Sequence, residues 1–491
     1  MPLGWKEGSG CLERRTPSRS PANASHALPI PSASFSCAGG LRANFVDDER
    51  GTVRAALLRD GGFWKRRRLP TTGRPLLHHV LCAERGVFRP SVYAMRDVLL
   101  AGARRSDAQL WSERGYHCVD APSCSDRVPR VGYVSHRVPA AVLAFNDKGA
   151  HLYHTLLESL ASAAPLLDHV RRGGDLRLLL NACLQKGDRR TTMTPPPPSG
   201  RCWPRCRSHR LVREAARLLG LPRTAVLDYV YAQQGVEEPA GGPAYFLGRA
   251  VWAAAPASWR GGAADGFAGG GRLNLPNWLL LREELKRSSP HLFSGGGSGG
   301  GVRVLYIRRE AWQGRQLVAR KEARLRRLLA ALPNVTVSEW GAADGDRGLA
   351  HAASRFGAAD AIVAPHGAAL TQLLFARPQT AVVEFLFRNE SGGAPNMYWT
   401  LSAALDLHYW LVLDTHPDSR NHTAPFTDVL PSDVLAALLA ALARRGTPVA
   451  PPPKGSVGRT LRQEMVEAAE AARTRAAAVC DAPPFGALRP C

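Results

Sequence analysis

Short apolar runs alternate with helix-patterned segments in the C-terminal half of this 491-residue chain. Val302–Ile307 is a run rich in β-branched residues, and Leu317–Leu332 follows it with apolar side chains at helical spacing. Strands separated by helices in this way pair in parallel, and the helices cover the faces of the sheet. The alternation therefore predicts an α/β fold built on a parallel sheet.

The same pattern continues along the chain and also precedes this region. A helix is expected over Asp344–Arg355, a strand at Ala361–Ala364, a helix from Gly367 to Phe375 and a strand over Thr380–Phe387. Further towards the N-terminus, the helical pattern of Leu211–Leu219 stops at Gly220, whereas Leu176–Leu180 fits either a strand or a helix.

Length and low-complexity segments suggest two domains with tails, because domains usually have ~100–200 residues. Residues 1–36 are rich in Pro, Ser and Arg, which predicts a disordered leader. We expect an N-terminal domain over 37–275 with loop insertions, and a C-terminal domain over 276–449. Residues 450–491 then form a Pro-rich linker and a helical tail.

The formal charge of +23 does not by itself indicate a nucleic-acid partner. Nearly all of the basic residues are arginines, which fits a GC-rich codon usage, and they are scattered apart from Lys65–Arg68. A nucleic-acid binder would show steeply salt-dependent binding. We expect no nucleic-acid partner, and the charge remains compatible with an anionic small substrate.

Polar residues stand where three of the predicted strands end. Arg308 and Arg309 follow the first strand, His366 and Gly367 follow the next, and Glu384 lies near the carboxyl end of the last. Ligands of open parallel sheets bind beyond the carboxyl ends of the strands. If the strands are neighbours, these groups converge on one site.

The chemistry of these groups suits a nucleotide diphosphate. Backbone N–H groups of Gly367 and Ala368 at a helix start favour an anion, and Arg308 can clamp a phosphate through two hydrogen bonds. His366 can donate to a phosphate or a sugar hydroxyl, and Glu384 can accept from ribose hydroxyls. The alternatives are an ordinary turn at the histidine and solvated charges at the other positions.

The stretches Phe356–Phe375 and Val382–Phe385 resemble glycosyltransferase family 61, which includes plant β-1,2-xylosyltransferases and animal O-linked N-acetylglucosaminyltransferases. Tyr306–Arg309 is similar to the strand-end arginine motif of that family. A looser resemblance covers Phe145–Glu158, where this chain has His151 at a position that is usually Asn.

His154 and Glu158 in this second region are spaced i, i+4 and share a face if the segment is helical. Such a pair can act as a general base and its orienting partner, and we expect one of the two to be the base. The alternative is a polar helix face that is merely solvated.

The resemblance implies a GT-B-like fold, with two Rossmann-like domains that face a cleft. It also implies an inverting transferase that moves xylose, N-acetylglucosamine or arabinose from a UDP-sugar to a hydroxyl of a glycan or glycoprotein. Arg308, Arg309, His366 and the turn at Gly367–Ala368 would then bind the donor. The alternative is a catalytically inactive relative that binds a glycan or a nucleotide.

We expect the reaction to need no metal and no tightly bound cofactor. Asp344-Gly345-Asp346 has the Asp-x-Asp form found in metal-dependent transferases, but it lies in a Gly-rich loop before a helix and is predicted to be a cap or a turn. Cys202, Cys206 and His209 lack a convincing fourth ligand for zinc, so a loop disulfide is favoured there.

The expected location is the lumen of the Golgi apparatus or endoplasmic reticulum. The chain contains glycosylation sequons at Asn23, Asn334, Asn389 and Asn421. The N-terminal residues lack the apolar segment of a signal peptide. Membrane attachment is therefore expected only through an anchor absent from this chain.

Overall fold

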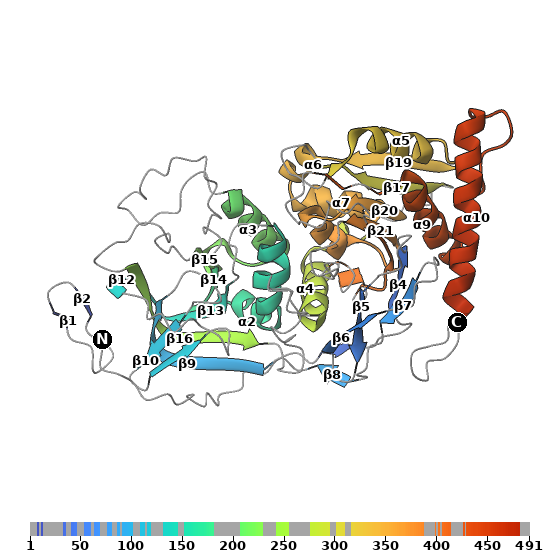
Figure 1. Cartoon of the computed structure of the whole chain (residues 1–491). Coiled ribbons are helices and arrows are strands. Elements are labelled where there is room, and N and C mark those ends of the chain that lie inside the picture. The colour runs from blue at the N-terminus through green and yellow to red at the C-terminus, as the bar shows by residue number, and fades with distance from the viewer. Residues whose placement is uncertain are drawn as a thin grey trace. The chain divides into compact units, whose positions relative to one another are not determined.

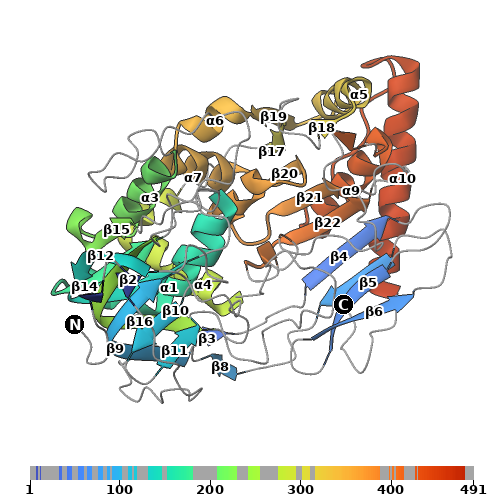
Figure 2. The same ribbon diagram turned by 60° about the vertical axis from the view of Figure 1, so that its left-hand side comes forward.

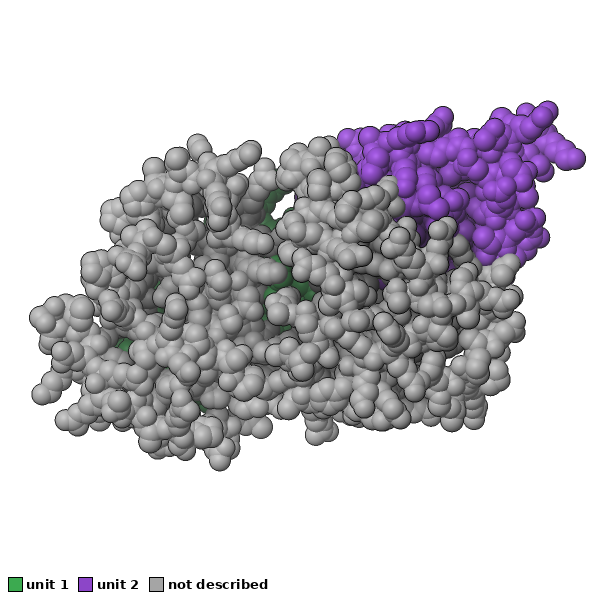
Figure 3. Space-filling model, viewed as in Figure 1, with its two compact units in different colours: residues 1–34, 87–257, 276–289 green, residues 35–86, 258–275, 290–491 purple. Residues whose placement is uncertain are grey.

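The structure is a computed structural model that forms two compact units (Figures 1 and 3). Unit 1 comprises 1–34, 87–257 and 276–289, and unit 2 comprises 35–86, 258–275 and 290–491. The described residues within them are 7–8, 11–12, 33–35, 41–46, 54–59, 63–68, 76–80, 86–88, 91–101, 109–112, 115–118, 131–145, 152–180, 207–228, 242–254, 275–294, 301–309, 316–386, 398, 401–402, 405–413, 426–427 and 429–481.

Unit 2 contains a largely parallel sheet in the order β19-β17-β20-β21-β22-β4-β7. Figure 2 shows its strands from β19 to β4. All neighbours in this sheet are parallel except β4 and β7. The α/β fold with a parallel sheet is thus confirmed. The strands are β4 (Leu41–Val46), β7 (Leu76–Val80), β17 (Val302–Ile307), β19 (Val335–Trp340), β20 (Ala361–Pro365), β21 (Ala381–Leu386) and β22 (His408–Leu413).

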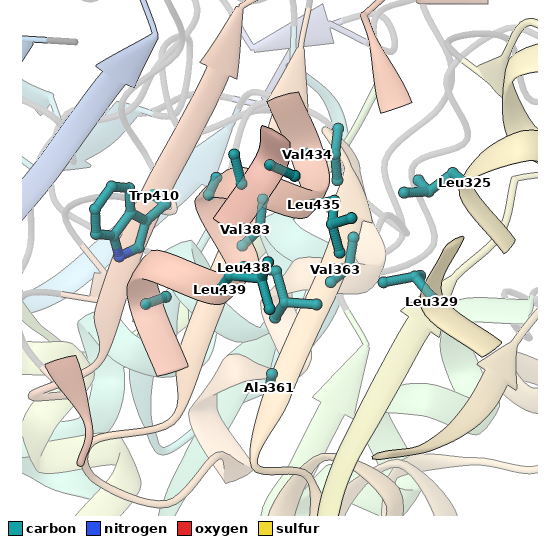
Figure 4. Packing of buried hydrophobic residues seen from close by; sticks show 14 of the residues in the cluster. Leu325, Leu329, Ala361, Val363, Val383, Trp410, Val434, Leu435, Leu438 and Leu439 are labelled. Atoms are coloured by element: carbon teal, nitrogen blue, oxygen red, sulfur yellow. The ribbon is translucent and has the colours of Figure 1, made fainter. Parts of the chain in front are cut away.

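One face of this sheet is covered by α5 (Ala319–Ala330) and α9 (Pro431–Arg444), as Figure 4 shows. Leu325, Leu328 and Leu329 of α5 recur at helical spacing and are fully buried against the strands. Pro431 starts α9, where its missing N–H costs no helix bond. Apolar packing on this face fixes the positions of the central strands.

Successive side chains of a strand point to opposite faces, so Glu384 points away from the α5–α9 face to which its neighbours Val383 and Phe385 contribute. The helices associated with the other face include α7 (Leu349–Ala358) and the 3₁₀ helix η8 (Ala368–Phe375). Ring packing between Phe293 and Phe375, with centroids 5.9 Å apart, adds to that layer.

Most predicted elements of unit 2 are confirmed, with one helix divided in two. The pattern over Asp344–Arg355 forms α6 (Ala342–Asp346) and α7 rather than one helix. Gly348 has a φ of 98° between them, a left-handed conformation that interrupts a right-handed helix and is accessible to glycine. The helix after Gly367 is a 3₁₀ helix.

Unit 1 contains a mixed sheet in the order β11-β10-β9-β16-β13-β14-β15, with β12 paired to β16. The pairs among β12, β13, β14, β15 and β16 are parallel, whereas β9, β10 and β11 join the sheet antiparallel. The strands are β9 (Ser91–Ala101), β10 (Gln109–Ser112), β11 (Gly115–Cys118), β12 (Val131–Val138), β13 (Ala140–Ala144), β14 (Leu176–Leu180), β15 (Val226–Asp228) and β16 (Gly242–Ala254).

The helices of unit 1 follow the parallel strands. The ambiguous run Leu176–Leu180 is a strand between β13 and β15, and the predicted helix before Gly220 is α3. The helices are η1 (His154–Leu160), α1 (Ala161–Ala163), η2 (Ala164–Leu166), α2 (Leu167–Arg171), α3 (Arg207–Leu218), η3 (Arg223–Ala225) and α4 (Leu275–Ser288).

The units divide the chain differently from the expected domain boundaries. Strand β4 belongs to unit 2 because it pairs with β22, although it precedes every strand of unit 1's sheet in sequence. Helix α4 was expected in the C-terminal domain, but 276–289 belongs to unit 1. There, Arg171 binds Glu284 at 2.6 Å, and the Ser289 hydroxyl donates to the carbonyl of Leu218 at 2.8 Å.

The expected C-terminal tail is part of unit 2. Helix α10 (Arg459–Asp481) packs on α9, where Met465, Ala468 and Ala472 are buried in the same core. None of the helices among the described residues is long and apolar enough to cross a membrane. Three short strands, β1 (Glu7–Gly8), β2 (Cys11–Leu12) and β3 (Ala33–Phe35), lie within residues 1–36, which were expected to be a disordered leader. The remaining short elements are β5 (Arg54–Arg59), β6 (Phe63–Arg68), β8 (Gly86–Phe88), β18 (Gln316–Leu317), β23 (Phe426–Thr427) and η6 (Pro290–Leu292).

Candidate functional site

The order of strands in unit 2 reverses between β17 and β20. From β17 the chain passes through α5 to β19 on one side, and it then returns through α7 to β20 on the other side. Such a switch point, at the carboxyl ends of the strands, is where open α/β sheets bind ligands. Arg308 and Arg309 follow β17, and His366 and Gly367 follow β20, so all four lie at this point.

Arg309 and His366 connect the two strand ends directly. The Nη1 of Arg309 donates to the backbone carbonyl of His366 at 3.0 Å. The same guanidinium covers Gly367, because a Cβ built on that glycine would lie 1.9 Å from Nη1. Gly367 has an extended φ of 172°, so the absence of a side chain serves this close approach rather than an unusual backbone conformation.

The side chain of His366 contacts a buried carboxylate. Its Nδ1 lies 2.5 Å from Oε1 of Glu384, which is fully buried on β21. The other carboxylate oxygen, Oε2, accepts a hydrogen bond from the hydroxyl of Tyr409 on β22. Tyr398 packs beside the imidazole, with ring centroids 5.4 Å apart.

Tyr409 is the donor in its contact with Glu384. Complete burial, and then the charge of Glu384 and the hydrogen bond to it, raise the pKa of Tyr409 well above its ordinary value. The phenol therefore stays protonated and donates to Oε2. Since both oxygens of Glu384 have partners within the protein, its contact with ribose hydroxyls stays a prediction.

Arg308 is tied to the end of β19 and lies near a carboxylate on α5. Its backbone N–H donates to the carbonyl of Trp340 at 2.8 Å, which ties the end of β17 to that of β19. Burial raises the pKa of Glu322 on α5, whereas the hydrogen bond from Tyr306 and the nearby charge of Arg308 oppose this rise. Glu322 is thus a carboxylate near Arg308 that the sequence patterns did not indicate.

Helix η8 offers backbone donors beside His366. The first hydrogen bond of this helix runs from Leu370 N to the carbonyl of Gly367 at 3.0 Å, so the N–H groups of Ala368 and Ala369 have no acceptor within the helix. Both alanines are partly exposed. This geometry is compatible with an anion at the start of η8, and the binding of a phosphate there stays a prediction.

Unit 1 holds the second pair of predicted residues. His154 and Glu158 lie in the π-helix η1, and Nδ1 of His154 is 2.8 Å from Oε2 of Glu158. π-Helical turns are rare and are found frequently at functional sites. Trp278 of α4 donates its indole N–H to the carbonyl of Leu157 at 2.7 Å, which anchors η1 next to Glu158. The pairing is confirmed, and the catalytic role stays a prediction.

The Asp-x-Asp segment has a structural role. Asp344 at the third helical position accepts the N–H of the N-cap residue Gly341 at 2.9 Å and so caps the start of α6, as predicted. It also lies 3.1 Å from Nε2 of His351. Among the described residues no group of three or more metal-binding side chains comes together. His151, Cys202 and Cys206 lie outside the described residues.

The comparison with protein families matches residues of both units. The family model described as Glycosyltransferase 61 matches residues 150–383. The match includes His154 and Glu158 of unit 1 as well as Arg308, Arg309 and His366 of unit 2, and it ends one residue before Glu384. No curated protein matches the chain.

Proposed function

Because the chain belongs to glycosyltransferase family 61, we propose that it transfers a sugar from a UDP-sugar to a hydroxyl group of a glycan or glycoprotein. Membership of this family implies a glycosyltransferase activity but does not name the sugar or the acceptor. The observation that carries the donor assignment is the contact between Arg309 and the carbonyl of His366 at the switch point of unit 2.

We propose that the diphosphate of the donor lies between Arg308, Arg309 and the start of η8. Arginine and unpaired backbone N–H groups are suited to phosphate oxygens, and charge-assisted hydrogen bonds of this kind are the strongest in proteins. Nε2 of His366 can contact a hydroxyl of the ribose or of the transferred sugar. Positive groups in these positions stabilise the negative charge that develops on the leaving UDP.

The proposed reaction is one displacement with inversion at the anomeric carbon. His154 or Glu158 takes the proton of the acceptor hydroxyl, and the acceptor oxygen forms a bond to the anomeric carbon. The bond from that carbon to the β-phosphate oxygen breaks, and UDP leaves with the electron pair. We propose no metal for this step, since arginines and the η8 N–H groups can stabilise the leaving group.

We propose the GT-B arrangement for the active enzyme, with unit 2 holding the donor and unit 1 the acceptor. This assignment is supported by the parallel strand pairs that each unit contains and by a family match that includes residues of both. We also propose that the enzyme works in the lumen of the Golgi apparatus or endoplasmic reticulum. The sequon at Asn334 is exposed, as glycosylation in that compartment requires.

The experiment that tests the function is a turnover assay with UDP-xylose, UDP-N-acetylglucosamine and UDP-arabinose. UDP release is measured without and with glycan or glycoprotein acceptors, and the product anomer is assigned by NMR. We expect one donor to be consumed with inversion, and the rate to fall in His154→Ala or Glu158→Ala. UDP binding without turnover of any donor would instead indicate a catalytically inactive relative.

A further inference from the structure

The buried carboxylate of Glu384 is joined to two side chains from two other segments of unit 2. His366 follows β20 and Tyr409 lies on β22, whereas Glu384 lies on the strand between them. The register pairs Glu384 with Leu411, so Tyr409 stands two residues away on the same face of the sheet. All three side chains are at least nine-tenths buried.

The backbone of His366 is fixed on both sides, which leaves only the orientation of its ring open. Its N–H donates to the carbonyl of Phe385 at 2.9 Å, and its carbonyl accepts from Arg309 at 3.0 Å. The contact between Nδ1 and Glu384 and the neighbouring ring of Tyr398 both help to orient the ring. A ring held in this way loses little entropy when a ligand binds.

Because the hydroxyl of Tyr409 donates to Oε2 of Glu384, it determines whether His366 or Glu384 carries the hydrogen between them. With Oε2 occupied by the phenol hydroxyl, an ionised Glu384 offers Oε1 as an acceptor. Nδ1 of His366 then carries the hydrogen, because a hydrogen bond at one ring nitrogen fixes the tautomer of the imidazole. Nε2 then carries a lone pair, so towards a ligand it acts as a hydrogen-bond acceptor.

We propose that Tyr409 and Glu384 are positioning residues for the donor site: they hold His366 in the Nδ1–H tautomer, so that Nε2 accepts a hydrogen bond from a ribose hydroxyl of the UDP-sugar. This inference rests on the proposed function, since it names the residues that set the chemistry of the same site. Tyr409 reaches the site only through Glu384 and His366, and it acts without touching the donor. The inference adds β22 to the elements that determine donor affinity.

The test compares Tyr409→Phe with Thr380→Val in the full chain. Both substitutions remove one buried hydroxyl and nearly keep the shape of the side chain. The hydroxyl of Thr380 instead donates to the carbonyl of Ala359, at the end of β21 away from His366. UDP affinity is measured by calorimetry, and the tautomer of His366 is read from its ¹⁵N ring shifts after selective histidine labelling. His366→Ala identifies the resonance.

In Tyr409→Phe we expect UDP affinity to fall roughly fivefold, as loss of one hydrogen bond of about 1 kcal/mol implies. We also expect loss of the single Nδ1–H signature of His366, and no such change in Thr380→Val. Glu384→Gln should weaken UDP binding as well, since an amide cannot hold the same pair of donors.

Several results would overturn the inference. If Tyr409→Phe keeps both the Nδ1–H tautomer of His366 and the UDP affinity of the wild type, Tyr409 contributes only to packing. A hydrogen on Nε2 and none on Nδ1 in the unliganded wild-type chain would exclude the proposed tautomer even if Tyr409→Phe does not fold. If wild-type protein binds no UDP at all, the proposed function itself fails, whereas the NMR measurement still decides the orientation of His366.

Discussion

The guanidinium of Arg309 donates a hydrogen bond to the backbone carbonyl of His366, 57 residues further along the chain, and joins the carboxyl ends of β17 and β20. These strands flank the point where the strand order of unit 2 reverses. A guanidinium in this position is fixed by the fold before a ligand arrives. Pre-organised positive charge of this kind is what a transferase needs at its leaving group.

Gly367→Ala should weaken UDP binding by displacing Arg309. The added Cβ would lie 1.9 Å from Nη1, so the guanidinium must leave its place over the turn. We expect roughly a tenfold loss of UDP affinity by calorimetry, which corresponds to ~1.4 kcal/mol of lost hydrogen bonding. Gly345→Ala in α6 is the matched control, because its Cβ would meet nothing within 4 Å. Equal affinities of the two variants would remove Arg309 from the donor site.

His154→Ala and Glu158→Gln should lower turnover while leaving UDP affinity unchanged. The two side chains contact each other at 2.8 Å in η1, so loss of either removes the base or its orienting partner. General-base catalysis is worth ~10²–10⁴-fold, and we expect a fall in kcat of at least about 100-fold. Glu283→Gln, whose exposed carboxylate binds Lys286 on the surface, serves as the control. Wild-type kcat in both variants would show that the base lies elsewhere.

Asp360→Asn should make unit 2 less stable in a way that depends on pH. Arg303, Arg377 and Arg445 all bind this one carboxylate, with contacts of 2.6–3.2 Å. Burial alone would raise the pKa of Asp360. The hydrogen bonds from Arg303 and Arg445 and the charge of Arg445 lower it by more, so the pKa is below its ordinary value.

A carboxyl group whose pKa is lowered on folding contributes stability above its unfolded pKa, about 3.9, and loses it as the pH falls through the folded value. We expect Asp360→Asn to lower the free energy of unfolding by about 2 kcal/mol near pH 7, as charge-assisted hydrogen bonds are lost. Urea titrations from pH 7 to pH 2 should show the two proteins converging at the acid end. A constant difference over the whole range would contradict the assignment.

Asn334 should carry an N-linked glycan if the protein passes through the secretory pathway. Asn334 and Thr336 are both exposed, at the start of the edge strand β19. After expression in eukaryotic cells with an added signal peptide, removal of N-glycans should lower the mass of the wild-type chain. Thr336→Ala should abolish one such decrease, and Thr336→Ser should retain it because the sequon persists. An unmodified Asn334 would weigh against the proposed compartment.

Much of unit 2 could be predicted from local pattern, because its strands are short apolar runs and its site residues follow them directly. Arg309 and His366 were found in this way. Tyr409 could not be found, since it stands in the apolar strand β22 and contacts Glu384 only through the register between two strands. Local patterns do not encode such a register.

Long-range pairing also explains the domain boundaries that the sequence could not predict. Strand β4 joins β22 across most of the chain, and α4 is held in unit 1 by contacts such as that between Trp278 and Leu157. Sequence order and linker composition carry no information on these contacts. Gly348 is a local feature, but a glycine within a helical pattern does not reveal its own φ.

The measurement that tests the account most directly is the binding of UDP to the wild-type chain, Arg309→Ala and His366→Ala. GDP and CMP, which carry other bases, are measured for comparison. Thermal shifts report this, because a ligand that binds only the folded state raises stability by about 2.7 kcal/mol at a hundred times its Kd. We predict a clear shift with UDP in the wild type and a much smaller one in both variants. Equal UDP shifts in all three proteins, or no shift with any nucleotide in well-folded wild type, would contradict a donor site at the ends of β17 and β20.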